Sequence, residues 1–153
     1  MKPLKQIFES REAVFAGFLI ATLGAGCVTP GGGGTELFNG KNLDGWEPTP
    51  GGKWEVKDGV IIGTSPKSER RHGILLTKKR FKDFVVKAKF RVVHGDSGFY
   101  FRVDRVKGGV SVHGFQVEVD ETDETGGLYE TGGRGWMHQP TAEVAKKRAY
   151  KKG

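Results

Sequence analysis

Residues 114–120 read GFQVEVD, and apolar and polar side chains alternate along this stretch. Such alternation predicts a half-buried β-strand, because successive side chains of a strand point to opposite faces of the sheet. The polar face of this strand would carry Gln116, Glu118 and Asp120 together. A row of one amide and two carboxyl groups is typical of an active site, of a sugar-binding surface or of a solvated sheet face. The alternation alone leaves all three interpretations open.

The segments before this strand also read as short strands separated by turns. Residues 53–64, KWEVKDGVIIGT, form two runs joined at Asp58-Gly59, a dipeptide typical of tight hairpins. Residues 73–84, GILLTKKRFKDF, predict a further strand and a turn. Residues 84–93, FVVKAKFRVV, alternate over their whole length and predict one long strand.

Two segments flank the strand predicted over residues 114–120 and contribute further polar and aromatic residues near it. Residues 97–104, SGFYFRVD, predict a strand with Tyr100 and Arg102 together on its polar face. Residues 121–136, ETDETGGLYETGGRGW, predict a glycine-rich loop. Three residues of this loop are candidates for ligand contact: Tyr129, Arg134 and Trp136.

The pattern of the whole chain indicates an all-β fold. No segment before residue 140 shows the 3.6-residue period of a helix, and short strands with turn signals favour a sandwich or jelly roll. After Pro140, residues 141–152 predict a short basic helix with Thr141 as its N-cap. Trp46 and Trp54 are expected to pack in the core or at its edge rather than to serve as sugar platforms.

The positive charge of the chain lies mainly at its C-terminal end. The formal net charge is +7, and residues 143–153 contain five cations and one carboxylate, so the rest of the chain carries +3. A nucleic-acid reader typically distributes basic and aromatic residues over its folded surface. The folded part shows no such pattern, and nucleic acid is therefore not expected as a partner.

The start of the chain has the layout of an export signal. Residues 1–12 carry Lys2, Lys5 and Arg11, and an apolar run over residues 13–26 precedes Cys27. This run is shorter than a membrane-spanning helix and suits the core of a signal peptide. Residues 1–27 resemble a bacterial lipoprotein signal in which Cys27 becomes acylated. Ordinary export without lipidation is the alternative.

A glycine-rich tether separates this signal from the folded domain. Residues 28–35 contain four consecutive glycines, which predict a flexible link to a single domain over residues 36–153. Cys27 is the sole cysteine, so the domain has no internal disulfide. The protein is expected to be exported, either anchored to a membrane through Cys27 or free in the periplasm or outside the cell.

Five blocks in order resemble one family, the 3-keto-disaccharide hydrolase domain. The blocks are LFNGKNLDGWE (37–47), WEVKDGVIIG (54–63), GILLTKKRFKDFVVKAKFRV (73–92), GDSGFYFR (95–102) and GFQVEVDETDETGGLYETGGRGW (114–136). The resemblance implies a concanavalin A-like jelly-roll β-sandwich that acts on a small glycoside whose C3 hydroxyl has been oxidised to a ketone. Family members usually continue past the position of Gly153, so we expect a truncated domain rather than a divergent short form.

The residue types in the polar row of Gln116, Glu118 and Asp120 limit the reactions that this face could catalyse. Ordinary retaining and inverting glycosidases use a pair of carboxyl groups, but the first position of the row is Gln116, which can serve neither as acid nor as nucleophile. A 3-keto sugar has an acidified hydrogen at C2, and removal of that hydrogen allows the C1 substituent to leave. We predict Glu118 as the base of such an elimination, with Asp120 or His113 assisting.

Other residues are assigned supporting roles in the same hypothesis. Arg102 or Arg134 would stabilise the oxyanion, and Tyr129 or Trp136 would stack against the sugar, with Tyr100 and Gln116 as further substrate contacts. A divalent metal held by Glu118, Asp120 and a histidine is a further hypothesis, although no ligand spacing supports it. A non-catalytic carbohydrate-binding module is the alternative function. DETDET, residues 120–125, offers oxygen ligands for calcium, but acidic turns usually bind none.

Overall fold

The computed structural model describes residues 4–5 and 34–147. Apart from residues 4–5, the predicted signal segment with Cys27 lies outside this part of the chain, as do residues 28–33 of the predicted tether. Nearly all regular secondary structure in the described residues is strand, which confirms the predicted all-β class. A single short helix, α1 (Ala142–Lys146), occurs among them, and Thr141 caps it by accepting a hydrogen bond from the Val144 amide, as predicted. No helix in the described ranges is long and apolar enough to span a membrane.

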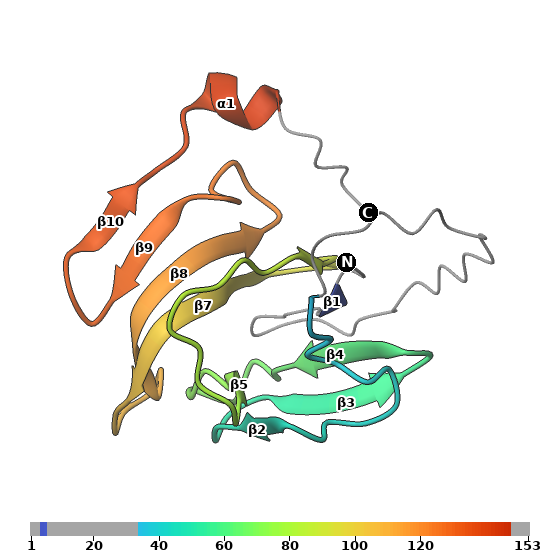
Figure 1. Ribbon diagram of the computed structural model, residues 1–153. Helices are drawn as coiled ribbons and strands as arrows, with labels where there is room; N and C mark the ends of the chain where they lie inside the picture. The colour runs from blue at the N-terminus through green and yellow to red at the C-terminus, as the bar shows by residue number, and fades with distance from the viewer. Residues whose placement is uncertain (1–3, 6–33, 148–153) are drawn as a thin grey trace, which may run out of the picture.

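One layer of the molecule consists of two short strand pairs (Figure 1). β2 (Trp46–Pro48) pairs with β5 (Leu75–Thr77), and β3 (Lys53–Lys57) pairs with β4 (Val60–Thr64), both antiparallel. The β3–β4 hairpin turns at the predicted dipeptide, where Asp58 and Gly59 have φ angles of 51° and 73°. Positive φ at both positions is what a type I′ turn requires.

The principal core cluster belongs to this layer. Its buried side chains are Phe38, Trp46, Ile61 and Leu75, and Trp54 packs against them. The Trp46 indole Nε1 donates a hydrogen bond of 3.0 Å to the Leu37 carbonyl, which satisfies its only polar atom in the core. Both tryptophans therefore pack as the sequence predicted.

The second layer is a four-stranded antiparallel sheet in the order β10-β9-β8-β7. β7 spans Asp96–Arg105, β8 spans Val112–Asp120, β9 spans Leu128–Thr131 and β10 spans Gly135–His138. Residues 121–136 are therefore not one loop, as the sequence predicted, but contain β9 and the start of β10. The reason is local, because Gly126 and Gly132 adopt positive φ angles of 85° and 76° and each reverses the chain.

The prediction of one long strand over residues 84–93 is wrong. Only β6 (Ala88–Lys89) is a strand there, and it pairs in parallel with β1 (Leu4–Lys5). A strand needs hydrogen-bonding partners along its length, and in the described part of the chain β1 is the only partner that β6 has. Most side chains of this segment are accordingly exposed, including Val85 at 81% and Phe90 at 42%, whereas Val92 is buried at 4%.

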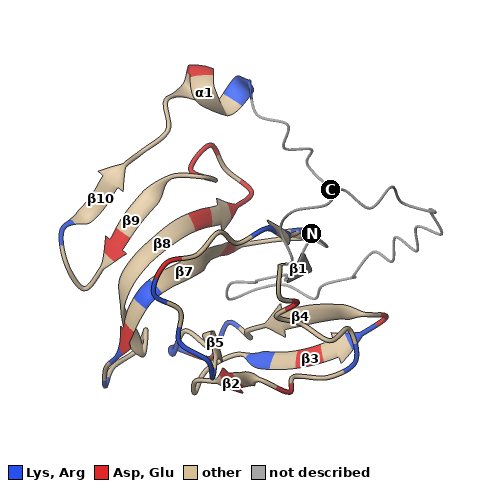
Figure 2. Cartoon of the chain, viewed as in Figure 1, with Lys and Arg blue, Asp and Glu red and all other residues tan. Residues whose placement is uncertain are grey.

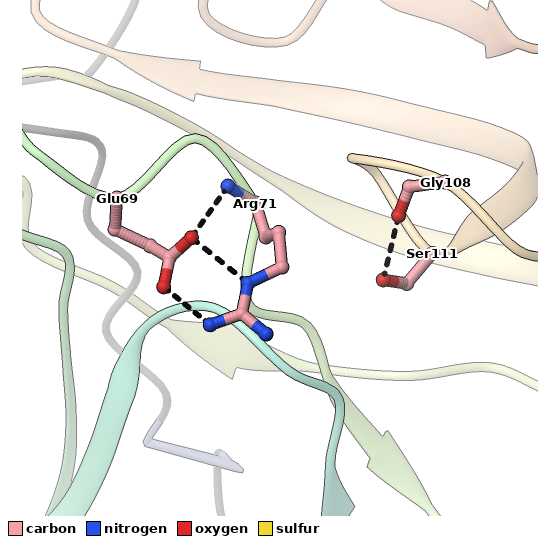
Figure 3. Close-up of polar contacts among 4 residues, drawn as sticks. All are labelled: Glu69, Arg71, Gly108 and Ser111. Atoms are coloured by element: carbon pink, nitrogen blue, oxygen red, sulfur yellow. Dashed lines mark hydrogen bonds and ion pairs between the residues drawn. The ribbon is translucent and has the colours of Figure 1, made fainter.

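The loop over residues 65–74 joins β4 to β5 and contacts the four-stranded sheet at the β7–β8 turn. The His72 amide donates a hydrogen bond of 2.6 Å to the Gly109 carbonyl in the β7–β8 turn. Glu69 and Arg71 form a two-point ion pair within the loop, and in the turn the Ser111 hydroxyl donates a hydrogen bond to the Gly108 carbonyl (Figure 3). Hydrogen bonds from Arg71 hold the pKa of Glu69 down at about 2, so the pair stays charged.

Candidate functional site

The polar row of β8 lies on a sheet face that contributes to a large cleft. In the strand register Gln116 lies opposite Tyr100 of β7 and Tyr129 of β9, while Glu118 lies opposite Gly98. The cleft has a volume of about 1610 Å³ and also contacts the other layer through Trp54. The residues of this sheet face that line it are Asp96, Gly98, Tyr100, Gln116, Glu118, Tyr129, Thr131 and Trp136.

Glu118 is the most chemically distinctive residue of this face. Its relative exposure is only 7%, and the acidic residues around it form a concentration of negative charge at the end of β8 (Figure 2). Burial raises the pKa of the Glu118 carboxyl to about 7, a hydrogen bond from Gln116 opposes the rise, and the charges of Asp96, Asp120 and Glu124 add to it. Glu118 therefore exchanges a proton near neutral pH, as a general base must.

Tyr100 lies across the sheet from β9. Its hydroxyl is 3.1 Å from the Oγ1 atom of Thr131, so the two side chains meet above β8. Burial raises the pKa of Tyr100, and the carboxyl of Glu118 contributes to the rise. The phenol therefore remains protonated at neutral pH and can donate a hydrogen bond into the cleft.

Tyr129 and Trp136 form the aromatic part of the same face. They are register partners in the β9–β10 hairpin, and their rings meet edge to face with centroids 5.4 Å apart. Trp136 retains 37% exposure, which leaves part of its ring open to a ligand. A rigid aromatic pair at the border of a polar cleft is suited to stacking against a sugar ring.

Asp120 has a different environment from Glu118, although it belongs to the same predicted row. It is 3% exposed, and its carboxyl accepts hydrogen bonds from the Thr122 amide, the Thr122 hydroxyl and the Thr125 hydroxyl. It is not among the residues that line the cleft. These contacts organise the DETDET turn from within, and its predicted assisting role remains a prediction.

The structure does not bring His113 near Glu118. His113 is exposed on β8 and precedes Glu118 by five residues, about 16 Å along a strand. Its ring covers Gly132, where an added Cβ would come within 2.2 Å of the His113 Cδ2 atom.

The two predicted oxyanion-stabilising arginines also lie away from Glu118. Arg134 forms an ion pair with Glu130 inside the β9–β10 hairpin and does not line the cleft. Arg102 lines the end of the cleft that is remote from Glu118, and its guanidinium is 3.8 Å from a carboxyl oxygen of Asp83.

The predicted alternation of β7 ends at Arg102. The register shifts between Phe101 and Asp104, and Arg102 has a φ angle of 51°. Two residues of β7 thus oppose one residue of β8, which is a β-bulge, and the bulge breaks the regular alternation of faces. Arg102 consequently lines both the main cleft and a second cavity beside Phe99 and Phe101.

Asp96 is a site residue that the sequence analysis missed. It lines the cleft at the exposed start of β7, yet burial of its carboxyl and the charges of Asp120 and Glu124 raise its pKa. Its even spacing from Tyr100 was the available signal, because residues two and four positions apart share a strand face. No group of three or more His, Cys, Asp or Glu side chains within residues 34–147 could hold a metal ion.

The fold and the site together define an all-β protein with an aromatic-walled cleft that contains a buried carboxyl group titrating near neutrality. Residues 33–151 match the model of a family described as the 3-keto-alpha-glucoside-1,2-lyase-like domain, and the chain belongs to this family. This is the family that the five sequence blocks resemble. No curated protein matches the chain.

Proposed function

We propose that this protein cleaves 3-keto-glycosides or 3-keto-disaccharides by elimination, on a concanavalin A-like jelly-roll scaffold. The observation that carries the proposal is Glu118, a carboxyl group that is 7% exposed, lines the cleft and has its pKa raised to about 7. A lyase activity in the description of the family supports the same chemistry.

The proposed reaction begins with proton removal at C2 of the sugar. The Glu118 carboxylate accepts this proton, and the electron pair of the C2–H bond moves towards the C3 ketone as an enolate. Collapse of the enolate forms a C1–C2 double bond and expels the C1 substituent, whose oxygen takes up a proton from water, while Glu118 releases the C2 proton to solvent and returns to its carboxylate form. The products are a free alcohol and an enone, and addition of water across the new double bond would complete a net hydrolysis.

Neighbouring residues are assigned the supporting roles. The neutral Tyr100 hydroxyl is positioned on the same face as Glu118 and can donate to a substrate oxygen, while Tyr129 and Trp136 stack against the sugar ring. Gln116 contacts the substrate and the base. Stabilisation of the enolate by Arg102 or Arg134, and assistance by Asp120 or His113, remain proposals that would require movement of these side chains towards Glu118.

A non-catalytic carbohydrate-binding module is the second candidate function. The Tyr129–Trp136 pair favours it, because partly exposed aromatic rings beside polar groups suffice to bind a sugar without any chemistry. The two functions differ in what they require of Glu118. A binding module needs its hydrogen bonds, whereas an elimination needs its basicity.

Replacement of Glu118 by glutamine separates the two candidates. We expect Glu118→Gln to abolish release of the C1 alcohol from a 3-keto-glycoside while binding of that glycoside, measured by calorimetry, is retained. Glu55→Gln is the matched control, because Glu55 is an exposed residue of β3 that pairs with Lys53. Wild-type turnover by Glu118→Gln would refute the assignment of the base, and binding without turnover by the wild type would favour the binding module.

We further propose that the protein is exported and anchored to a membrane through an acylated Cys27. The sequence of residues 1–27 supports this proposal. Cell fractionation tests it, since Cys27→Ser should move the protein from the membrane fraction to the soluble fraction. The same distribution for both forms would favour export without lipidation.

A further inference from the structure

Gly98 of β7 occupies an unusual place in the sheet, because a neighbouring side chain fills the space where its own would be. Gly98 is buried and lies opposite Glu118 in the register. A Cβ atom added to Gly98 would come within 2.3 Å of Cγ, 2.5 Å of Cδ and 2.7 Å of Nε2 of Gln116. The Gln116 side chain thus lies across the backbone of β7 at the one position without a side chain.

This placement allows Gln116 to reach Glu118. The two residues are two positions apart on β8, where α-carbons are separated by about 6.5–7 Å and side chains stand roughly parallel. Both side chains line the cleft, and hydrogen bonding by Gln116 lowers the pKa of the Glu118 carboxyl. Any larger residue at position 98 would have to displace the Gln116 amide.

The charges around Glu118 make this single hydrogen bond important. The titratable groups that face it are Asp96 and Tyr100 from β7, Asp120 from β8 and Glu124 from the β8–β9 loop. Burial and the three carboxylates raise the pKa of Glu118. Among the side chains of residues 34–147, only that of Gln116 lowers this pKa. An amide can donate to a carboxylate without becoming charged itself, so its donation favours the ionised form.

We infer that Gly98 is a positioning residue, whose missing side chain gives Gln116 the room to hold the Glu118 carboxylate in the form that accepts a proton. The inference rests on the proposed function, in which Glu118 is the base. It assigns a purpose to the glycine of the GDSGFYFR block and to the amide that begins the polar row of β8.

The test combines a titration that needs no substrate with a pH–rate profile. In the full-length protein labelled with [¹³C]carboxyl glutamate, the pKa of Glu118 is read from its chemical shift, with Glu118→Gln identifying the resonance. Gln116→Met and Gly98→Ala should each raise this pKa by about one unit, since each removes one hydrogen bond to a charged group. The double variant Gly98→Ala/Gln116→Met should show no rise beyond that of Gln116→Met alone.

Two further comparisons keep the outcomes distinct. Gly109→Ala is the control, because a Cβ there meets only ordinary contact at 3.6 Å, and it should leave the pKa unchanged. If Gly98→Ala fails to fold, Gly98→Ala/Gln116→Ala should fold, because shortening Gln116 removes the clashing atoms.

An unchanged pKa in Gly98→Ala or in Gln116→Met would overturn the inference, as would failure of the shortened double variant to fold. In the pH profile of kcat, the rate should rise with pH at an apparent pKa set by the base. In each variant this apparent pKa should shift by the same amount as the pKa of Glu118 in the titration. If the titration shifts and this apparent pKa does not, Gly98 still positions Gln116, but Glu118 is not the base.

Discussion

The hydroxyl of Tyr100 on β7 and the Oγ1 atom of Thr131 on β9 lie 3.1 Å apart, so that the two side chains bridge the intervening strand β8. This contact fixes the phenol over the polar row, next to the Gln116 position that Tyr100 opposes in the register. The relationship joins three strands around one face of the cleft. The orientation of Tyr100, a proposed substrate contact, therefore depends on the pairing of β7, β8 and β9.

Removal of the Tyr100 hydroxyl should impair turnover more than stability. We expect Tyr100→Phe to lower kcat/KM about tenfold through loss of one hydrogen bond to the substrate, and to lower the free energy of unfolding by about 1 kcal/mol. Steady-state kinetics and urea unfolding measure the two effects. Thr131→Val is the control, since it removes the partner of the phenol but leaves the phenol itself; an equal loss of turnover in both variants would indicate a purely structural role.

The aromatic pair should contribute to binding rather than to folding. Trp136 is 37% exposed, so we expect Trp136→Ala to weaken glycoside binding about tenfold, equivalent to about 1.4 kcal/mol, with little change in the unfolding transition. Calorimetric titration provides the measurement. Met137→Ala is a matched control, because Met137 is 38% exposed, adjacent in sequence and absent from the cleft lining. Equal affinities of the two variants would exclude Trp136 as a sugar-stacking residue.

The Asp120–Thr125 contacts should matter for stability. Thr125 is only 5% exposed. Its hydroxyl accepts a hydrogen bond from the Asp120 amide and lies within hydrogen-bonding distance of the Asp120 carbonyl and carboxyl oxygens. Thr125→Val leaves buried polar groups without this partner, and we expect a loss of about 1–3 kcal/mol in the free energy of unfolding. Asp120→Asn distinguishes the roles of Asp120: a large loss of kcat with unchanged stability would show direct assistance in the reaction, whereas a loss of stability would show that it organises the turn.

The raised pKa of Glu118 has a defined effect on stability. Its pKa of about 7 in the folded protein exceeds the ordinary value of 4.5, so the folded state binds this proton more tightly than the unfolded state. The resulting stabilisation is fully present below the ordinary pKa and is lost as the pH rises through 7. We expect Glu118→Gln to remove a pH dependence on the order of 2–3 kcal/mol between about pH 4 and pH 8. Parallel pH profiles of urea unfolding for both proteins would contradict the assignment.

Local signals in the sequence predicted local structure well. The Asp58-Gly59 turn and the Thr141 cap depend on the backbone preferences of a few adjacent residues, and both occur as predicted. Strands β9 and β10 were missed because the glycine turns before and after β9 lie close together, and each of the two strands has only four residues. The segment over residues 84–93 has a strand pattern, but a pattern cannot supply the pairing partner that a long strand needs.

The site was predictable only as far as the side-chain period of a strand allows. The shared face of Gln116 and Glu118 with Tyr100 follows from alternation, and the structure agrees. The bulge at Arg102 and the burial of Glu118 depend on how strands meet, which no single segment encodes. The contact between Gly98 and Gln116 likewise exists only once β7 and β8 are in register.

The central claim, that Glu118 removes the C2 proton, is tested most directly by following that hydrogen. A 3-keto-glycoside carrying deuterium at C2 is incubated with the protein in ordinary water, and loss of the label is measured by NMR alongside release of the C1 alcohol. We predict that the wild type releases the label together with the alcohol and shows a primary isotope effect, and that Glu118→Gln releases neither above the background rate. Label loss at the wild-type rate in Glu118→Gln would contradict the account.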